Sequence, residues 1–343
     1  MACRMDDLAY VVVLNWNGES CIRECLRSVL NQTYSPYRVL VVDNGSTDGS
    51  PAVIASEFPE ASLIRLPENR HFARGSNVGM QEALKDPQCS YVVTLNNDTC
   101  VDPEWLHELV RASQPHAGMT ACKMLFMDRT RLINSTGFWI AQDGSAMDRG
   151  WNQPDEGQFD EAFDVFGPTA GAALYRRELL QAVGLFDEDF LAYYEDLDLA
   201  WRGRLAGWDA RFAPRSIVYH KFSASFGKGG SFKTYLCERN RIWNLIHNYP
   251  QRYVPLAIPW NFARVLAGPI PWNGVHAGDA EAASSGFRDT VAAMARARID
   301  AYAGLSRAFA KRRERRRICR VDARTVGGWL RRYGLSLKDA VAA

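Results

Sequence analysis

Short apolar runs alternate with segments of helical spacing over the first hundred residues, and this alternation limits the fold more than any other feature. The runs are residues 10–14, 39–42, 62–66 and 91–95. Ile22, Leu26 and Val29 follow the first run with the spacing of one helix face, and residues 75–84 give another helical segment. Strands that alternate with helices form parallel sheets with right-handed crossovers, so the sequence predicts an α/β fold with a mostly parallel sheet.

The pattern changes after residue 98. We expect a helix over 102–112, shorter strands with Gly/Asp-rich turns over 120–170, and a strand of small residues over 170–175. Two more helices are expected, over 176–183 and 197–205. These elements predict a second lobe fused to the first.

The last part of the chain is strongly basic. Residues 287–343 carry 15 Lys/Arg and 5 Asp/Glu, although the whole chain has a formal net charge of only +2. Residues 287–317 are expected to form one basic helix. Its charges could form a solvated surface, a patch that binds nucleic acid or a contact with anionic lipid. Aromatic residues for base stacking are not interleaved with these charges, so we expect no nucleic acid partner.

A membrane-spanning helix is not expected. Residues 250–275 are apolar, but prolines at 255, 259, 269 and 271 interrupt them, whereas a spanning helix needs about 20 uninterrupted apolar residues. The aromatic residues there suit a membrane interface or an ordinary buried segment. The first residues lack the basic and apolar stretches of a secretory signal, so a cytoplasmic protein is expected.

Two acidic clusters about a hundred residues apart indicate an enzyme active site. One closes the fourth apolar run at Asp98, and the other places Glu195, Asp196 and Asp198 at the start of a helix. The carboxyl end of a parallel strand is where α/β proteins bind ligands. Transfer from a diphosphate-activated donor requires one carboxylate that binds a hard divalent cation and another that takes a proton. The eight cysteines contain no Cys-x-x-Cys pair typical of zinc.

Five ordered motifs resemble those of the family-2 glycosyltransferases, and the rhamnosyltransferase-like branch is the most similar in appearance. They are residues 11–18, 41–50, 68–79, 95–98 and 194–198. The resemblance implies a GT-A type fold, a nucleotide-diphosphate sugar donor, Mg²⁺ or Mn²⁺, and inversion at the anomeric carbon. We expect a catalytic domain over 1–245, with a nucleotide-sugar-binding half at 8–98 and an acceptor half at 99–245. Residues 246–343 would form a C-terminal apolar and basic helical region.

The resemblance implies eight donor-binding residues: Asn15, Asn17, Asp43, Asn44, Arg74, Asn77, Asn96 and Asn97. Asp43 ends the second strand, where its carboxylate would accept hydrogen bonds from the base or the ribose. Arg74 would offer its charge to the phosphates. Residues 239–241, Arg-Asn-Arg, also resemble a family segment near the donor diphosphate or the acceptor.

The resemblance also implies that Asp98 and His220 hold the metal. Asn96 stands where the family has the first Asp of an Asp-x-Asp motif, so this chain lacks one charged ligand. Many relatives place a histidine on the cation at the position of His220, and a purely structural role is the alternative for a lone histidine.

Asp196 matches the family's catalytic base, and Glu195 is expected to shape the acceptor site. The metal stabilises the leaving nucleoside diphosphate, so one base that deprotonates the acceptor hydroxyl is enough. The alternative is a helix-cap carboxylate without chemistry. We expect repulsion from Glu195 and Asp198 to raise the pKa of Asp196, and Asp198 to pair with Arg202.

The sequence therefore predicts an inverting glycosyltransferase of cell-surface polysaccharide synthesis. It would move a sugar, with L-rhamnose as the candidate, onto a hydroxyl of a glycan or a polyprenyl-linked acceptor. The alternatives are an inactive sugar-nucleotide- or membrane-binding scaffold, suggested by Asn96, and a nucleotidyltransferase, which would need a Gly-rich basic loop after the first strand. The C-terminal helix resembles membrane-associating tails of lipid-linked glycan enzymes, so peripheral binding to anionic lipid on the inner face of the membrane is expected.

Overall fold

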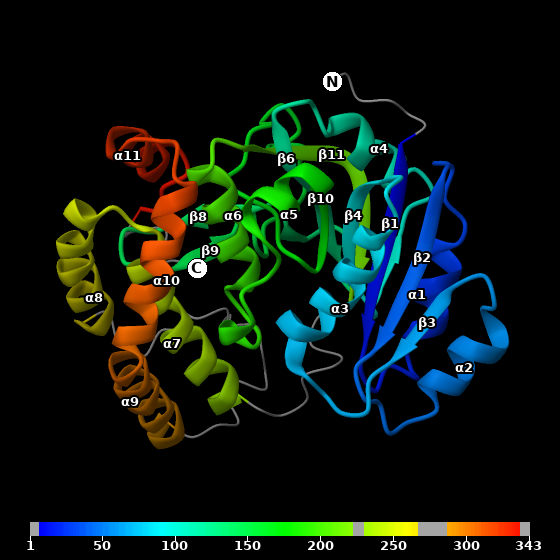
Figure 1. Cartoon of the computed structure of the whole chain (residues 1–343), viewed down its shortest axis with the longest axis horizontal. Helices are drawn as coiled ribbons and strands as arrows, with labels where there is room; N and C mark the ends of the chain where they lie inside the picture. The colour runs from blue at the N-terminus through cyan, green and yellow to red at the C-terminus, as the bar shows by residue number, and fades with distance from the viewer. Residues whose placement is uncertain (1–6, 222–229, 267–286, 337–343) are drawn as a thin grey trace.

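One curved sheet forms the centre of the molecule (Figure 1). The computed structural model describes residues 7–221, 230–266 and 287–336. Among these residues the strands follow the order β3-β2-β1-β4-β10-β6-β11-β5, and β7 pairs with β6 outside this path.

The first half of the sheet is parallel, as the sequence predicts. β1 (Leu8–Asn15) lies between β2 (Tyr37–Asp43) and β4 (Cys89–Asn96), and β3 (Ser62–Arg65) lies beyond β2. In this register Asn15 is opposite Asp43, and Leu14 is opposite Asn96. The carboxyl ends of three strands therefore meet at one edge, where α/β proteins bind ligands.

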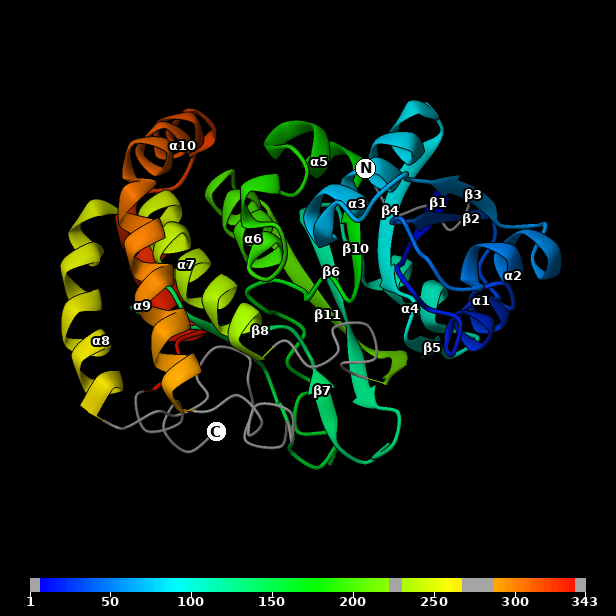
Figure 2. The ribbon, with the colours of Figure 1, turned by 90° about the horizontal axis from the view of Figure 1, so that it is seen from below.

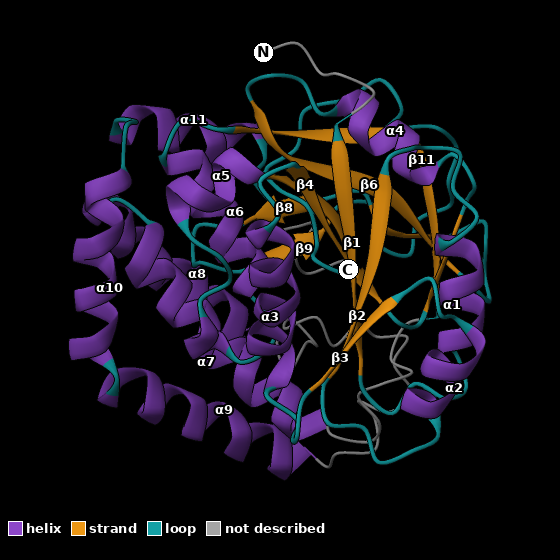
Figure 3. Ribbon diagram, turned by 45° about the vertical axis from the view of Figure 1, so that its right-hand side comes forward, coloured by secondary structure: helices purple, strands orange, loops and turns teal. Residues whose placement is uncertain are grey.

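Helices cover both faces of this sheet (Figure 3). α1 (Ile22–Val29), α2 (Ser50–Glu57) and α4 (Trp105–Ala112) share one buried apolar cluster with alternate strand residues such as Val11 and Val13. α3 (His71–Lys85), α5 (Arg177–Val183) and α6 (Glu195–Leu205) share the other cluster with Val12. Successive strand side chains point to opposite faces, so each strand contributes to both cores.

The second half of the chain extends the same sheet. β10 (Ala172–Arg176) runs antiparallel between β4 and β6 (Ala117–Phe126), β11 (Asp209–His220) runs parallel to β6, and β5 (Thr99–Val101) pairs with β11. The main strands of the expected second lobe therefore belong to the same sheet as those of the first. Its remaining strands are β7 (Ile133–Ser135) and a hairpin of β8 (Phe138–Ile140) and β9 (Ala146–Asp148).

The expectation of only short strands over residues 120–170 is wrong for β6. This strand has ten residues, and all ten are buried. A strand covered on both faces shows no alternation of polar and apolar residues, so its sequence lacks the usual strand signal.

A layer of C-terminal helices lies at the end of the molecule away from β3 (Figures 1 and 2). α9 (Phe287–Ala303) packs along α7 (Gly230–Asn248), and α10 (Leu305–Ile318) contacts both α7 and α6. The short helix η2 (Gln251–Leu256), α8 (Ala257–Leu266) and α11 (Ala323–Arg332) complete the described part. No helix in the described ranges is long and apolar enough to cross a membrane, and the predicted apolar segment 250–275 lies partly outside those ranges.

The expectation of one basic helix over 287–317 is wrong, because α9 and α10 are separate helices that meet at Gly304. A Cβ atom at Gly304 would lie 3.0 Å from Cζ2 of Trp243 on α7. A residue without a side chain lets the junction approach the indole ring closely. The junction between α9 and α10 thus makes a tertiary contact that helical spacing alone does not reveal.

Candidate active site

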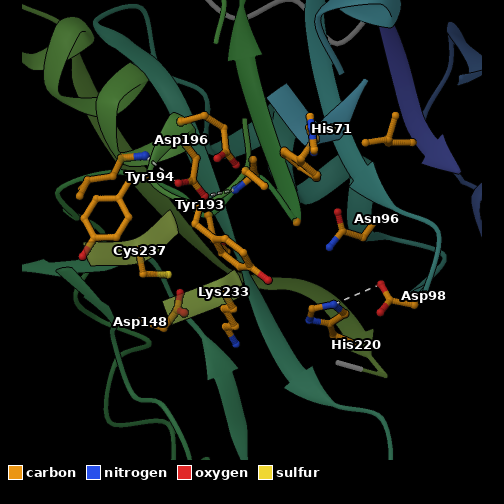
Figure 4. Close-up of a pocket in the computed structure, with 18 of the residues that line it drawn as sticks. His71, Asn96, Asp98, Asp148, Tyr193, Tyr194, Asp196, His220, Lys233 and Cys237 are labelled. Atoms are coloured by element: carbon orange, nitrogen blue, oxygen red, sulfur yellow. Dashed lines mark hydrogen bonds and ion pairs between the residues drawn. The ribbon is translucent and has the colours of Figure 1, made fainter. Parts of the chain in front are cut away.

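A cavity of about 290 Å³ opens at the carboxyl ends of β1 and β4 (Figure 4). Its walls come from both halves of the chain and from α7. Seven of the residues predicted from the sequence line it: Asn44, Asn96, Asn97, Asp98, Glu195, Asp196 and His220. Chain segments more than a hundred residues apart in sequence therefore form one site.

Asn15 ties three strand ends together beneath this cavity. Its side chain is fully buried; its Nδ2 donates to Oδ1 of Asp43 at 3.0 Å and to Oγ of Ser50 at 2.9 Å, and its Oδ1 accepts from Nδ2 of Asn97 at 2.9 Å. Asp43 is 1% exposed, and its Oδ2 lies 4.0 Å from Nε of Arg65. Asn15 and Asp43 therefore form the floor under the predicted donor site and do not line the cavity itself.

Asn44 and Asn17 fix the neighbouring loops. Asn44 donates to the carbonyl of His71 at 3.2 Å and accepts from the backbone N–H of Arg70 at 2.9 Å, so it sets the start of α3 beside the cavity. Asn17 is exposed and accepts from the backbone N–H of Thr47 at 2.8 Å. Asn17 thus joins two loops and does not line the cavity.

Arg74 and Asn77 are not brought to the cavity, in contrast to the expectation. Both lie on the side of α3 that contacts the 3-10 helix η1 (Glu188–Phe190). Nε of Arg74 lies 2.6 Å from Oε2 of Glu188, and Nδ2 of Asn77 donates to the carbonyl of Phe186 at 2.9 Å. Their polar groups bind this turn, and neither residue lines the cavity.

Asp98 and His220 meet in the cavity, as the resemblance implies. Nε2 of His220 lies 3.2 Å from Oδ1 of Asp98, and the backbone N–H of Lys221 donates to the carbonyl of Asp98 at 2.9 Å. Nδ1 of the same ring lies 3.0 Å from Oδ1 of Asn134 on β7. Nε2 is therefore the ring nitrogen that faces the Asp98 carboxylate, and Nδ1 is the one that faces Asn134.

The 3.2 Å distance between Nε2 of His220 and Oδ1 of Asp98 suits either a hydrogen bond or a cation bound by both atoms. A carboxylate oxygen and an imidazole nitrogen are suitable ligands for Mn²⁺, and the oxygen also suits Mg²⁺. Adjacent ligands at right angles, with bonds of about 2.1 Å, lie about 3 Å apart. The pair therefore fits one divalent ion, although no group of three or more His, Cys, Asp and Glu ligands occurs among the described residues.

Asp196 faces the cavity from the first turn of α6. Its Oδ2 accepts from the backbone N–H of Ala170 at 2.9 Å, and its Oδ1 accepts from the backbone N–H of Leu197 at 2.7 Å. Burial raises the pKa of the Asp196 carboxyl, and these N–H donors offset part of that rise. The expected repulsion by Glu195 and Asp198 is therefore not the main cause.

Glu195 and Asp198 differ sharply from each other. Glu195 is 4% exposed, and its Oε2 has no hydrogen-bond partner among the described residues. Burial, followed by the charge of Asp196, raises the pKa of the Glu195 carboxyl well above the usual range. Asp198 is fully buried and pairs with Arg202 at 2.8 Å, as predicted. Of the three carboxylates, Glu195 and Asp196 line the cavity and Asp198 lies behind them.

A strained segment leads into α6. Leu191, Tyr193 and Tyr194 have φ values of 65°, 66° and 73°, a region that non-glycine residues seldom adopt. Asn240 on α7 donates to the carbonyls of Phe190, Ala192 and Tyr193 at 2.8–3.0 Å. The segment 239–241 thus holds this backbone in place and does not line the cavity.

Sequence reasoning missed several cavity residues. Asp148 on β9 and Lys233 on α7 lie opposite the Asp98–His220 pair, with Tyr193 between the two groups (Figure 4). Burial raises the pKa of Asp148 to about 7. Residues 169–171 also line the cavity, and their small size was a signal in the sequence for a close approach. A Cβ atom at Gly171 would lie 3.4 Å from Nδ2 of Asn96.

Comparison with known proteins agrees with this geometry. The model of the family "Glycosyl transferase family 2" matches residues 10–184, just over half of the 343 residues. The O-antigen biosynthesis protein RfbC of Myxococcus xanthus is 29% identical over 214 residues, which cover 60% of this chain and 16% of that protein. The N-acetylglucosaminyl-diphospho-decaprenol L-rhamnosyltransferase of Mycobacterium tuberculosis is 26% identical over 251 residues, which cover 65% of this chain and 79% of that protein.

Solved structures share the fold at low sequence identity. GalNAc-T7 with UDP, GalNAc and Mn²⁺ superposes with a TM-score of 0.57 at 15% identity, over 71% of this chain and 48% of that chain. S. aureus TarS 1–349 in complex with UDP superposes with a TM-score of 0.51 at 16% identity, over 94% of this chain and 91% of that chain. The predicted GT-A type fold is confirmed, and with the family model the conclusion is direct: the chain belongs to glycosyl transferase family 2.

Proposed function

We propose that this glycosyltransferase moves a sugar from a nucleotide-diphosphate donor onto a hydroxyl of a glycan or polyprenyl-diphosphate-linked acceptor, with inversion at the anomeric carbon. One observation carries the proposal: the Asp98–His220 pair and Asp196 line the same cavity. Inversion requires that the acceptor attacks from the face opposite the leaving group. The cation site and the base must therefore lie on opposite sides of the bound sugar.

Asp98 and His220 are the proposed ligands of a divalent cation, Mg²⁺ or Mn²⁺. When bound, this ion would neutralise charge on the leaving diphosphate. With two protein ligands, the remaining coordination positions would be open to phosphate oxygens and water. Asn96 and Asn97 would then contact the donor through amide groups that add no charge to the site.

The nucleotide is proposed to bind over β1 and β2. Leu14, Trp16, Asn44 and Asn69 line that part of the cavity, and the buried Asn15–Asp43 pair supports it from below. Arg74 and Asn77 are omitted from the proposed donor contacts because both bind the η1 turn.

Asp196 is the proposed base. Its carboxylate accepts two backbone hydrogen bonds that fix its orientation, while its partly exposed side faces the cavity. It would take the proton of the acceptor hydroxyl as the oxygen attacks the anomeric carbon. Glu195, whose buried Oε2 has no partner among the described residues, would bind a second hydroxyl of the acceptor.

L-rhamnose is the first candidate sugar, because a relative of which this chain covers 79% is named as an N-acetylglucosaminyl-diphospho-decaprenol L-rhamnosyltransferase. The same relative and RfbC support a role in building a cell-surface polysaccharide. The chain spans only a small part of RfbC, so that relative supports the chemistry of the shared segment alone.

Two alternatives keep the fold without this chemistry. An inactive sugar-nucleotide-binding scaffold is suggested by Asn96, and the retained Asp98, His220 and Asp196 argue against it. A nucleotidyltransferase would need a basic Gly-rich loop after β1, and residues 15–18 read Asn-Trp-Asn-Gly instead.

We further propose that the protein works on the inner face of the cell membrane, where α8, α9 and α10 would contact anionic lipid. These helices lie together at the end of the molecule away from β3 (Figure 2). Large exposed apolar side chains occur on these helices: Ile258, Phe262, Ile299, Tyr302 and Phe309. Exposed Arg313, Arg316 and Arg317 add positive charge on α10. Apolar side chains beside arginines are typical of surfaces that bind an anionic membrane.

The proposed reaction is tested by product analysis. The protein is incubated with a panel of nucleotide sugars, Mn²⁺ or Mg²⁺, and a polyprenyl-diphosphate glycan, and the product linkage is read by NMR. Transfer from one donor, with the opposite anomeric configuration in the product, is expected. A product of retained configuration would overturn the inverting mechanism, and donor binding without turnover would favour the scaffold.

A further inference from the structure

Three cations on one face of α10 bind an acidic turn beside the cavity. Arg307, Lys311 and Arg315 are spaced four residues apart, so they lie on the same side of the helix. Arg307 pairs with Asp189, Nζ of Lys311 lies 2.9 Å from Oδ1 of Asp187, and Nη2 of Arg315 lies 2.8 Å from Oδ2 of Asp187. Part of the basic charge seen in the sequence therefore faces the catalytic half of the chain.

Arg315 differs from the other two because it also reaches α6. Its Nη1 lies 2.7 Å from Oδ1 of Asp198 and 3.3 Å from Oδ1 of Asn248. The Arg315 side chain is 5% exposed, and the Asp198 side chain is fully buried. Burial alone would raise the pKa of Asp198, but Arg315 and Arg202 outweigh burial and lower that pKa to about 2. Asp198 is therefore ionised, and Arg315 joins two buried carboxylates from different elements.

These two carboxylates flank the strained segment. Asp187 lies just before η1, where it accepts from the backbone N–H of Asp189 at 3.2 Å. Asp198 lies in the first turn of α6, just after the residues that have positive φ values. Strained backbone persists only where the surrounding structure holds it. Asn240 holds the middle of the segment, and Arg315 holds both of its ends.

We propose that Arg315 is a positioning residue for the transfer reaction. By bridging Asp187 and Asp198 it fixes the backbone that carries Tyr193, Tyr194 and Asp196 in the cavity. The C-terminal region is then part of the catalytic unit and more than an attached tail. The role in transfer rests on the proposed function of Asp196, whereas the effect on backbone order does not.

The test compares Arg315→Gln with Arg324→Gln, which removes an exposed charge on α11. Hydrogen–deuterium exchange is measured without substrate. In Arg315→Gln, amides of residues 187–198 should exchange about tenfold faster or more, while those of β1 and β4 stay as protected as in wild type. The release of nucleoside diphosphate should fall about tenfold or more with little change in donor affinity, because a small displacement of a catalytic group is costly.

Arg315→Lys covers the case in which Arg315→Gln does not fold. Lysine keeps the charge but cannot bridge two carboxylates with a planar fork. It should keep the melting temperature near that of wild type and still lose protection at 187–198. The proposal would be overturned if both Arg315 variants exchange like the wild type. It would also be overturned if Arg315→Gln loses protection evenly over all strands while Arg315→Lys behaves like the wild type. A wild-type protein that turns over no donor would instead contradict the proposed function and leave the exchange result interpretable.

Discussion

At the residue scale, the properties of Asp196 depend on burial more than on its acidic neighbours. Burial raises the pKa of this carboxyl, and the backbone N–H groups of Ala170 and Leu197 offset part of the rise. A base must be deprotonated to act, and it acts best when its pKa is near the working pH. A raised pKa therefore suits the proposed role.

The rate of transfer should depend on this ionisation. Because Asp196 is active only as the carboxylate, kcat should rise with pH through a value above the ordinary aspartate pKa of about 3.9. The pH dependence of kcat at saturating donor checks this, and donor binding measured over the same pH range is the control. A rate that stays constant down to about pH 4 would contradict the assignment.

Asn134 orients the proposed metal ligand. Its Oδ1 lies 3.0 Å from Nδ1 of His220 and fixes which ring nitrogen faces Asp98. Replacing Asn134 by Leu should raise the Mn²⁺ concentration for half-maximal activity about 10- to 100-fold, since second-shell partners typically contribute that much to metal affinity. Asn31→Leu changes an exposed asparagine elsewhere and should leave metal dependence unchanged. Equal metal dependence in both variants would show that His220 needs no such partner.

Motifs predicted part of this site because their chemistry follows from strand ends and helix starts. Asp98 lies two residues after the end of β4, and Asp196 lies in the first turn of α6, so their positions could be read from local patterns. Asn134, Asp148 and Lys233 lie on elements whose position beside the cavity depends on tertiary packing. Arg74 and Asn77 have motif identities that fit a donor site, but they share the side of α3 that packs on η1.

At the element scale, the loop before α6 depends on α7. Asn240 is fully buried and donates to three backbone carbonyls of that loop. Asn240→Ala should lower the free energy of unfolding by about 2–4 kcal/mol, because buried carbonyls lose their donors. Urea denaturation measures the change, and Gln251→Ala, an exposed position just beyond α7, is the matched control. A loss below about 0.5 kcal/mol would mean that the loop holds its conformation unaided.

Regular alternation made the first half of the sheet predictable, and its absence made the second half harder. β1 to β4 each precede a clear turn or helix, so their places along the chain and their parallel direction followed from the pattern. β6 is buried along its whole length, and the junction at Gly304 packs against Trp243. Both features depend on what the segment packs against, which the local sequence does not contain.

At the scale of the whole molecule, the basic charge of the C-terminal region is divided between two faces. Arg307, Lys311 and Arg315 face the acidic turn before α6, whereas Arg313, Arg316 and Arg317 are exposed. The sequence predicts the charge but not this division, which depends on how α10 lies on α6 and α7. The inner face supports the site, and the outer face is the surface proposed to meet the membrane.

Binding to anionic vesicles should depend on the outer face. The triple change Arg313→Gln, Arg316→Gln and Arg317→Gln should weaken binding about 100-fold, since each charge near an anionic leaflet contributes about 1 kcal/mol. Co-sedimentation with phosphatidylglycerol vesicles measures this. A matched triple change of Lys85, Arg111 and Arg129 to Gln, at exposed positions elsewhere, should have little effect. If both triple variants bind alike, the outer face of α10 is not the contact.

The most direct test of the central claim compares wild-type protein with Asp196→Asn. Release of nucleoside diphosphate is followed with Mn²⁺, acceptor and the donor that the wild type uses, and donor binding is measured by calorimetry for both proteins. The account predicts that Asp196→Asn binds the donor as the wild type does and loses at least about a hundredfold in rate, the contribution of a general base. A variant that keeps the wild-type rate would show that another group takes the proton and would contradict the assignment of Asp196.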